Sequence, residues 1–154
     1  MINFDIKRLG KILNIILTIG FVCFIPIFLI SPYMLKNSTS ILYSSLIIYP
    51  NGILMLGIII QFMRLFKSLE NDDPFTYKNV NILYVTGIIS FIMSFIWIID
   101  LLFMIFIVHN TYINYIIVLL FLFILFLGVG IALFILSLLF RKATDYKLEN
   151  DLTI

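Results

Sequence analysis

The sequence has few charged residues. Only 12% of its 154 residues are Asp, Glu, Lys or Arg, against about 25% in ordinary soluble domains. Hydrophobic residues make up 63% of the chain, and the mean hydropathy is +1.19. This composition excludes a water-soluble globule, and the net charge of +2 is too small for a surface that binds nucleic acid directly.

The residues that carry most enzyme and metal chemistry are also scarce. The chain has one cysteine, Cys23, so it contains neither an intrachain disulfide nor a Cys-x-x-Cys motif. It has one histidine, His109, and no His-Glu-x-x-His, glycine-rich phosphate loop or Gly-x-Ser-x-Gly segment. We therefore predict no catalytic residues, no bound metal and no cofactor, and we expect that the protein is not an enzyme.

Four long apolar runs dominate the sequence. They cover residues 12–34, 41–65, 80–108 and 112–140. Each is at least as long as the roughly 20 residues that cross a hydrocarbon core as a helix. The segments between them are too short to fold alone. We predict a single membrane domain over residues 1–154, an all-α four-helix transmembrane bundle followed by a cytoplasmic tail at residues 141–154.

The basic residues are divided unequally between the connecting segments. Nine of the ten Lys and Arg lie before the first run, around the link between the second and third, or after the fourth, and only Lys36 lies elsewhere. Because positive residues in short loops stay in the cytoplasm, both termini and the middle link are predicted to be cytoplasmic. The same residues attract anionic headgroups of the lipid bilayer, which is the expected partner. Frequent Ile, Phe, Asn, Lys and Tyr are typical of an AT-rich bacterial genome, so we expect a multi-pass protein of the bacterial cytoplasmic membrane.

Asp100 is the one acidic residue within an apolar run. An acid in the hydrocarbon region is costly and usually faces the interior of the protein. At 1.5 Å per residue, Asp100 lies about 12 Å and Asn51 about 15 Å below the outer ends of their runs, so we predict that the two form a pair. One interpretation makes Asp100 a neutral residue that hydrogen-bonds between helices. The other makes it a proton or cation site, with Trp97 lining it.

Small residues and prolines predict details of helix packing. Gly128 and Ala132 form a small-xxx-small pair, which permits close approach of helices within the bundle or between copies in a homo-oligomer. We favour the contact within the bundle. Pro26 is expected to bend the first helix, and Pro50 to kink the second beside Asn51.

The middle link has the signals that start a helix. In the segment NDDPFTYKN, Asp73 or Thr76 is placed to cap the third helix, and Pro74 suits the first helical position.

The same segment carries a resemblance, together with the closing stretch ATDYKLENDLTI. On these residues the chain resembles the YoaS-like family of small bacterial integral membrane proteins, catalogued as a domain of unknown function. Relatives often have Asn-Pro-Phe-Thr in the middle link, where this chain has Asp73 before Pro74. The resemblance implies no activity, but it implies a cytoplasmic partner, because members are often encoded beside a small helix-turn-helix regulator.

The closing segment is the candidate site for that partner. Its residues are Glu149, Asn150, Asp151, Leu152, Thr153 and Ile154. The two aliphatic residues have no core to enter, so we expect that they bind a partner, this protein's own middle link or the lipid interface.

Two function classes follow from these observations. The first is a non-enzymatic sensing or regulatory membrane protein whose cytoplasmic partner is a transcriptional regulator. The alternative is a small transporter or immunity-type membrane protein that uses Asp100 as a proton or cation site. A transporter is expected to show inverted repeats or discontinuous helices. We find no repeat between the halves of the sequence, so the first class is preferred.

The topology can be tested by labelling. Cysteines introduced at Asn37 and Asn110 are expected to react with a membrane-impermeant reagent in intact cells, whereas cysteines at Ser68 and Thr153 are not. Labelling of the Thr153 position from outside would contradict the predicted orientation.

Overall fold

A computed structural model describes residues 6–34, 41–70, 74–108 and 113–152 of the chain. These residues form α1 (Ile6–Met34), α2 (Ile41–Glu70), α3 (Tyr77–Phe103), the short π-helix η1 (Met104–Val108) and α4 (Ile113–Leu152). Four of these helices are long and apolar enough to cross a membrane. The predicted all-α fold of four membrane helices is confirmed, and the side on which the termini lie stays a prediction.

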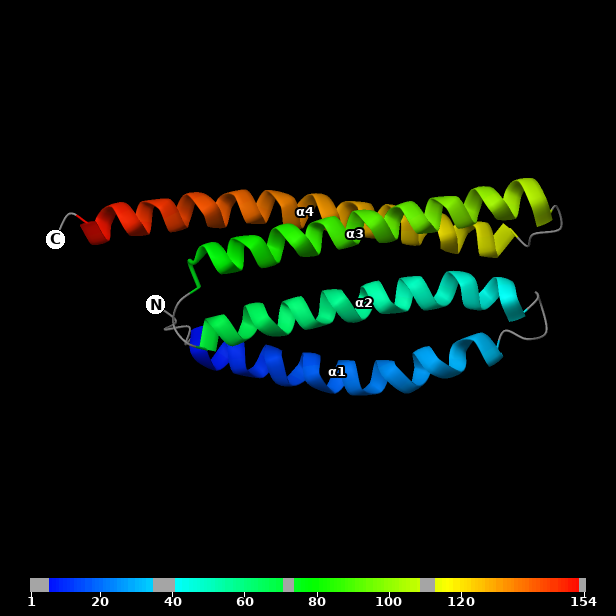
Figure 1. The fold of residues 1–154 in the computed structure, drawn as a ribbon, viewed down its shortest axis with the longest axis horizontal. Coiled ribbons are helices and arrows are strands. Elements are labelled where there is room, and N and C mark those ends of the chain that lie inside the picture. Colours follow the sequence, from blue (N-terminus) through cyan, green and yellow to red (C-terminus); the bar gives the residue numbers. More distant parts are fainter. Residues whose placement is uncertain (1–5, 35–40, 71–73, 109–112, 153–154) are drawn as a thin grey trace.

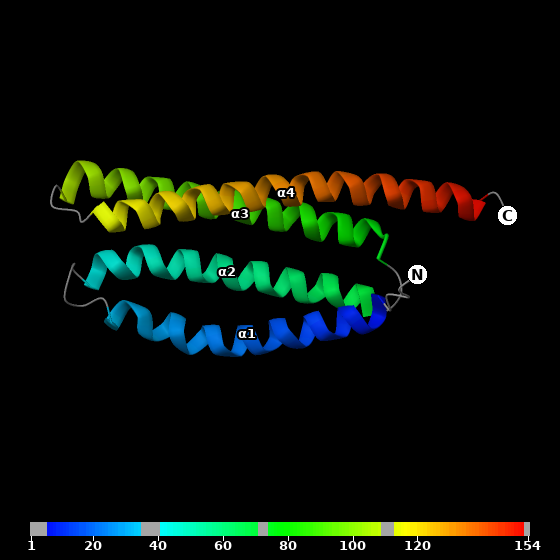
Figure 2. The same ribbon diagram turned by 180° about the vertical axis from the view of Figure 1, so that it is seen from behind.

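The four long helices lie antiparallel in a row, in chain order (Figure 1). α1 packs on α2, α2 on α3, and α3 on α4, and the same order is seen from behind in Figure 2. The starts of α1 and α3 lie together with the ends of α2 and α4, and we call this the terminal end and the other the far end. In the described part of the chain, α1 and α4 share no extended interface, so the row is open at both edges.

The helices are longer than the apolar runs that predicted them. α1 begins at Ile6 instead of residue 12, α2 ends at Glu70 instead of residue 65, and α4 continues through the predicted tail to Leu152. Hydropathy marks the part of a helix that suits lipid, but backbone hydrogen bonding continues wherever the residues favour it. Residues 141–152 contain no Gly or Pro, so nothing in them ends α4.

Thr76 caps the start of α3. Its backbone is extended, and its side-chain oxygen accepts a hydrogen bond from the backbone N–H of Asn79 at 3.3 Å. The other candidate, Asp73, lies outside the described residues. Asn79 is fully buried and its Nδ2 donates to Ser68 Oγ of α2 and to the carbonyl of Pro74, both at 2.8 Å. The cap and this amide fix the start of α3 against the end of α2.

α3 and α4 meet along a seam with a repeat of seven residues. Near the middle of the seam their backbones approach at Gly87 and Gly130, where a Cβ on Gly130 would lie 3.3 Å from the carbonyl oxygen of Gly87. Seven residues to either side, Ser94 Oγ donates to the carbonyl of Phe123 at 3.3 Å, and Ser137 Oγ donates to the carbonyl of Val80 at 3.1 Å. This constant spacing is the register of an antiparallel coiled coil, with small side chains at the contact points.

The predicted packing role of Gly128 and Ala132 within the bundle is wrong. Both residues are exposed, and a Cβ on Gly128 would meet no atom within 4 Å. The close contact uses Gly130 instead, which lies about 200° around the helix from Gly128. Because α4 is apolar on all sides, its hydropathy does not show which side faces α3.

The two glycines of α4 give a matched test. Gly130→Leu is expected to lower the stability of the protein in detergent by about 1–3 kcal/mol, since its side chain would push Gly87 and Phe91 away. Gly128→Leu adds the same side chain where there is space and is expected to cause no loss. Thermal unfolding followed by circular dichroism measures both, and equal melting temperatures would contradict the seam.

Candidate functional site

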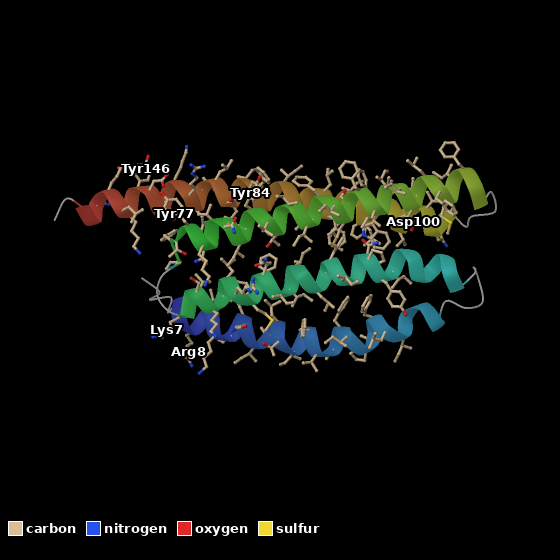
Figure 3. The ribbon with its side chains drawn as sticks, in the orientation of Figure 1. Lys7, Arg8, Tyr77, Tyr84, Asp100 and Tyr146 are labelled. Carbon is tan, nitrogen blue, oxygen red and sulfur yellow. The ribbon has the colours of Figure 1, made fainter. Side chains whose placement is uncertain are left out.

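Asp100 is buried in α3, with 3% of its surface exposed. It lies in the half of α3 nearer the far end, where Figure 3 labels it. Among the described residues that are buried, it is the one ionisable side chain. The burial of Asp100 that the sequence predicted is therefore present.

The helix changes its form directly after Asp100. The backbone N–H of Met104 donates to the carbonyls of both Asp100 and Leu101, and the chain then continues as the π-helix η1. π-helical turns are rare and often lie at functional sites. This turn has no signal in the sequence, because residues 101–108 are apolar throughout and predict a continued α-helix.

A hydrophobic cluster holds this end of α3 against α4. Its buried members are Leu101, Met104 and Leu119, and Trp97, Ile98 and Ile116 pack against them. The indole of Trp97 thus belongs to the packing beside Asp100, with its Nε1 buried. A displacement of this part of α3 would therefore be transmitted to α4 through these contacts.

Asn51 is buried in α2, with 4% of its surface exposed. α2 continues as one helix through Pro50. Gly52, the residue after Asn51, makes room for α1 because any side chain there would overlap the ring of Phe28. Phe28 also packs edge-to-face on Tyr49, with ring centroids 5.5 Å apart. The Pro-Asn-Gly segment therefore places a buried amide beside the point where α1 docks on α2. Pro26 lies within α1, which Figures 1 and 2 show as a curved helix.

The register of α2 and α3 sets the relative depth of Asn51 and Asp100. Ser68 meets Asn79 at the terminal end, and eleven residues earlier along α2 Gly57 faces Ile89. Continued at the same register, Asn51 is level with about residues 95–96 of α3, next to Trp97. Asp100 lies about one turn, or roughly 7 Å, nearer the far end. The predicted pair is thus buried in adjacent helices with Trp97 between the two levels.

Small polar residues that the sequence did not predict as site residues line the buried side of α3. They are Asn79, Thr86, Ser90 and Ser94. Thr86 Oγ1 donates to the carbonyl of Ile82 at 2.6 Å, and Ser90 Oγ donates to the carbonyl of Thr86 at 3.0 Å. Their hydroxyls are satisfied by the helix itself, so we assign them to close packing. The spacing of four or seven residues between Asn79, Thr86, Ser90 and Ser94 is the signal that could have identified this face.

The predicted partner-binding tail is the end of α4. α4 has 40 residues, so it is about 60 Å long, and it extends past the start of α3 at the terminal end (Figure 1). Glu149 and Asn150 are exposed, Asp151 and Leu152 belong to the helix, and Thr153 and Ile154 lie outside the described residues. We call residues 141–152 the helical arm.

Two contacts hold the base of the helical arm. The hydroxyl of Tyr77 donates to Asp145 Oδ1 at 2.6 Å, and the rings of Phe75 and Phe140 lie 5.5 Å apart. Beyond them Tyr146 is 66% exposed and Leu148 is 45% exposed. Figure 3 shows Tyr77 and Tyr146 at this end of the molecule. The arm therefore presents apolar and charged side chains beyond the row of helices.

Within the described ranges, no three His, Cys, Asp or Glu side chains come together as the ligands of a metal would. Comparison with known proteins gives one match: a family model described as "Protein of unknown function (DUF2975)" covers residues 32–154, from the end of α1 through the helical arm. No curated protein and no solved structure matches the chain. The family match thus includes Asp100, Asn51 and the closing segment, and it assigns no role to them.

Two substitutions separate the interpretations of Asp100. If it only bonds between helices, Asp100→Asn is expected to be tolerated, while Asp100→Leu lowers stability in detergent by about 1 kcal/mol. If it is a proton or cation site, Asp100→Asn abolishes function but keeps stability, because an amide cannot ionise. Thermal unfolding, measured alongside the phenotype of a deletion strain, decides between them. Ile99→Leu, on the exposed side of α3, is the control, and an unchanged Asp100→Leu variant would contradict the buried placement.

Proposed function

The chain belongs to the DUF2975 family, and we propose that it is a non-enzymatic regulatory protein of the membrane whose helical arm binds a cytoplasmic partner. In this proposal the buried polar region around Asp100 responds to a signal within or across the membrane. α4 then conveys the response to residues 141–152.

The observation that supports this proposal is the continuity of α4. One unbroken helix packs beside Asp100 through Leu119 and Ile116 and extends to Leu152 at the other end. The heptad seam with α3 joins the two regions, so a shift of α3 at the far end reaches the arm without a flexible link. Coupling of this kind needs a chain of packed elements with two arrangements, and α3 and α4 supply the packed chain.

The helical arm fits a partner that binds a helix in a groove. It carries exposed Tyr146 and Leu148 between charged residues, and short amphipathic helices bind grooves through such apolar residues. The resemblance to the YoaS-like bacterial membrane proteins makes a helix-turn-helix transcriptional regulator the partner that we propose.

The distribution of charge supports a cytoplasmic location for the arm. The described basic residues belong to the terminal end, where Figure 3 shows Lys7 and Arg8. Because positive residues stay on the cytoplasmic side, we propose that the terminal end faces the cytoplasm of a bacterial cell.

A second candidate function is a small transporter or immunity-type protein in which Asp100 binds a proton or a cation. The observation in its favour is the π-helical turn that follows this buried acid. In the described residues the four helices form an open row, so this function would require several copies around a shared path. The Asp100→Asn variant distinguishes the two candidates.

The partner proposal is tested by truncation. A tagged chain that lacks Leu148 to Ile154 is expected to remain in the membrane, since all four long helices are retained, but to lose its cytoplasmic partner in co-purification. The full-length Leu148→Ser variant separates the loss of an apolar contact from the loss of length. Unchanged recovery of bound proteins from the truncated chain would mean that the segment only ends the helix.

A further inference from the structure

α2 and α3 share an open face that carries an amphipathic stripe. On α3 its exposed residues recur every three or four positions: Lys78, Asn81, Tyr84, Ile88, Ile92 and Phe95. On α2 the exposed residues near the terminal end are Ile60, Arg64 and Lys67. Both helices are thus polar at the terminal end of this face and apolar beyond it.

Helix geometry turns the two exposed sides in the same direction. Viewed from the terminal end, the exposed residues of α2 lie about 60° clockwise from its contacts with α3, and those of α3 lie about 130° anticlockwise from its contacts with α2. α4 packs on the opposite side of α3 and passes behind it in Figure 1. The open face is therefore the side of the row seen in that figure.

The polar residues of the open face lie at one level. Ser68 and Asn79 are hydrogen-bonded, so their neighbours Lys67 and Lys78 are next to each other. At the same antiparallel register, Arg64, Lys67, Lys78 and Asn81 fall within about 8 Å along the helix axes. In the part of the chain that the structure describes, these three cations form no ion pair, and the Asn81 side chain has no hydrogen-bond partner.

The chemistry of this face matches a phospholipid. The cations lie where the headgroups of the leaflet at the terminal end are expected. Asn81 adds an amide donor on a side of the helix that faces lipid. From Asn81 to Phe95 the apolar stripe runs for about 21 Å, which is more than the roughly 15 Å thickness of one leaflet's hydrocarbon.

We propose that the open face binds one anionic phospholipid. Its phosphate contacts Arg64, Lys67 and Lys78 and accepts a hydrogen bond from Asn81, while its acyl chain lies along Ile88, Ile92 and Phe95. A topology signal alone requires only that cations lie in the right loops. It does not require cations of two helices to converge on one face above an amide and an apolar stripe. A soluble phosphate compound would make no use of the stripe.

The test uses the full chain purified in detergent, with phosphatidylglycerol as the probe. We expect native mass spectrometry to retain one phosphatidylglycerol per chain, and the same lipid to raise the melting temperature. Phosphatidylcholine with identical acyl chains is expected to have little effect on either measurement, and glycerol phosphate none. Equal binding of phosphatidylcholine, or saturation by glycerol phosphate, would overturn the proposal.

Two triple variants locate the site. In Arg64→Gln, Lys67→Gln, Lys78→Gln the affinity for phosphatidylglycerol is expected to fall at least tenfold. In Lys7→Gln, Arg8→Gln, Lys11→Gln, which removes the same charge from the same end on α1, it should change less than twofold. Equal losses would mean diffuse attraction instead of a site.

Asn81→Leu provides a test that keeps every cation. This substitution removes the amide and leaves the charges, so we expect the affinity for phosphatidylglycerol to fall about threefold while the fold is unaffected. If the triple variant on α2 and α3 does not purify as a folded protein, Asn81→Leu still tests whether phosphatidylglycerol binds at this face. An unchanged affinity would overturn the assignment of the headgroup to this face.

Discussion

The close approach of α3 and α4 is the contact on which the rest of the structure depends. In lipid, burying apolar side chains gives helices little reason to associate, so close van der Waals packing and hydrogen bonds between helices must hold them together. Gly87 and Gly130 let the two backbones meet, and Ser94 and Ser137 bond across the seam at intervals of seven residues. With α3 fixed in this way, Asn79 is aimed at α2 and Asp100 is held inside the protein.

The seam also explains why most buried polar residues belong to α3. A small hydroxyl side chain keeps the helices close and satisfies itself on a carbonyl of its own helix, as Thr86 and Ser90 do. Asp100 is different in kind, because its carboxyl group is both buried and ionisable. It lies where the seam ends and the helix changes to η1. The buried acid is therefore located at the end of the regular packing between α3 and α4.

The sequence predicted the helices well and their rotation poorly. A long apolar run predicts a membrane helix, because in the absence of water its backbone groups must form hydrogen bonds within the segment. They do not show which side faces a neighbour when every side is apolar. That is why Gly128 was preferred to Gly130 and why η1 was not anticipated. Asp100 and Asn51 were identified because a polar group in an apolar run stands out, and both are buried. Residues 141–152 continue α4 where the sequence predicts a separate tail, because polarity ends the apolar run while helix formation continues.

The junction between α2 and α3 joins the two helical hairpins of the protein. α1 and α2 form one hairpin around Phe28 and Gly52, and α3 and α4 form the other around the seam. At the terminal end, the side chain of Asn79 in one hairpin donates a hydrogen bond to Ser68 in the other. A phosphate held by cations of both α2 and α3 would lie over this contact and bridge the two hairpins. Asn51 and Asp100 lie along the same junction toward the far end. The angle between the hairpins would then depend on the lipid at one end and on the buried polar residues at the other, and α4 would carry that angle to the helical arm.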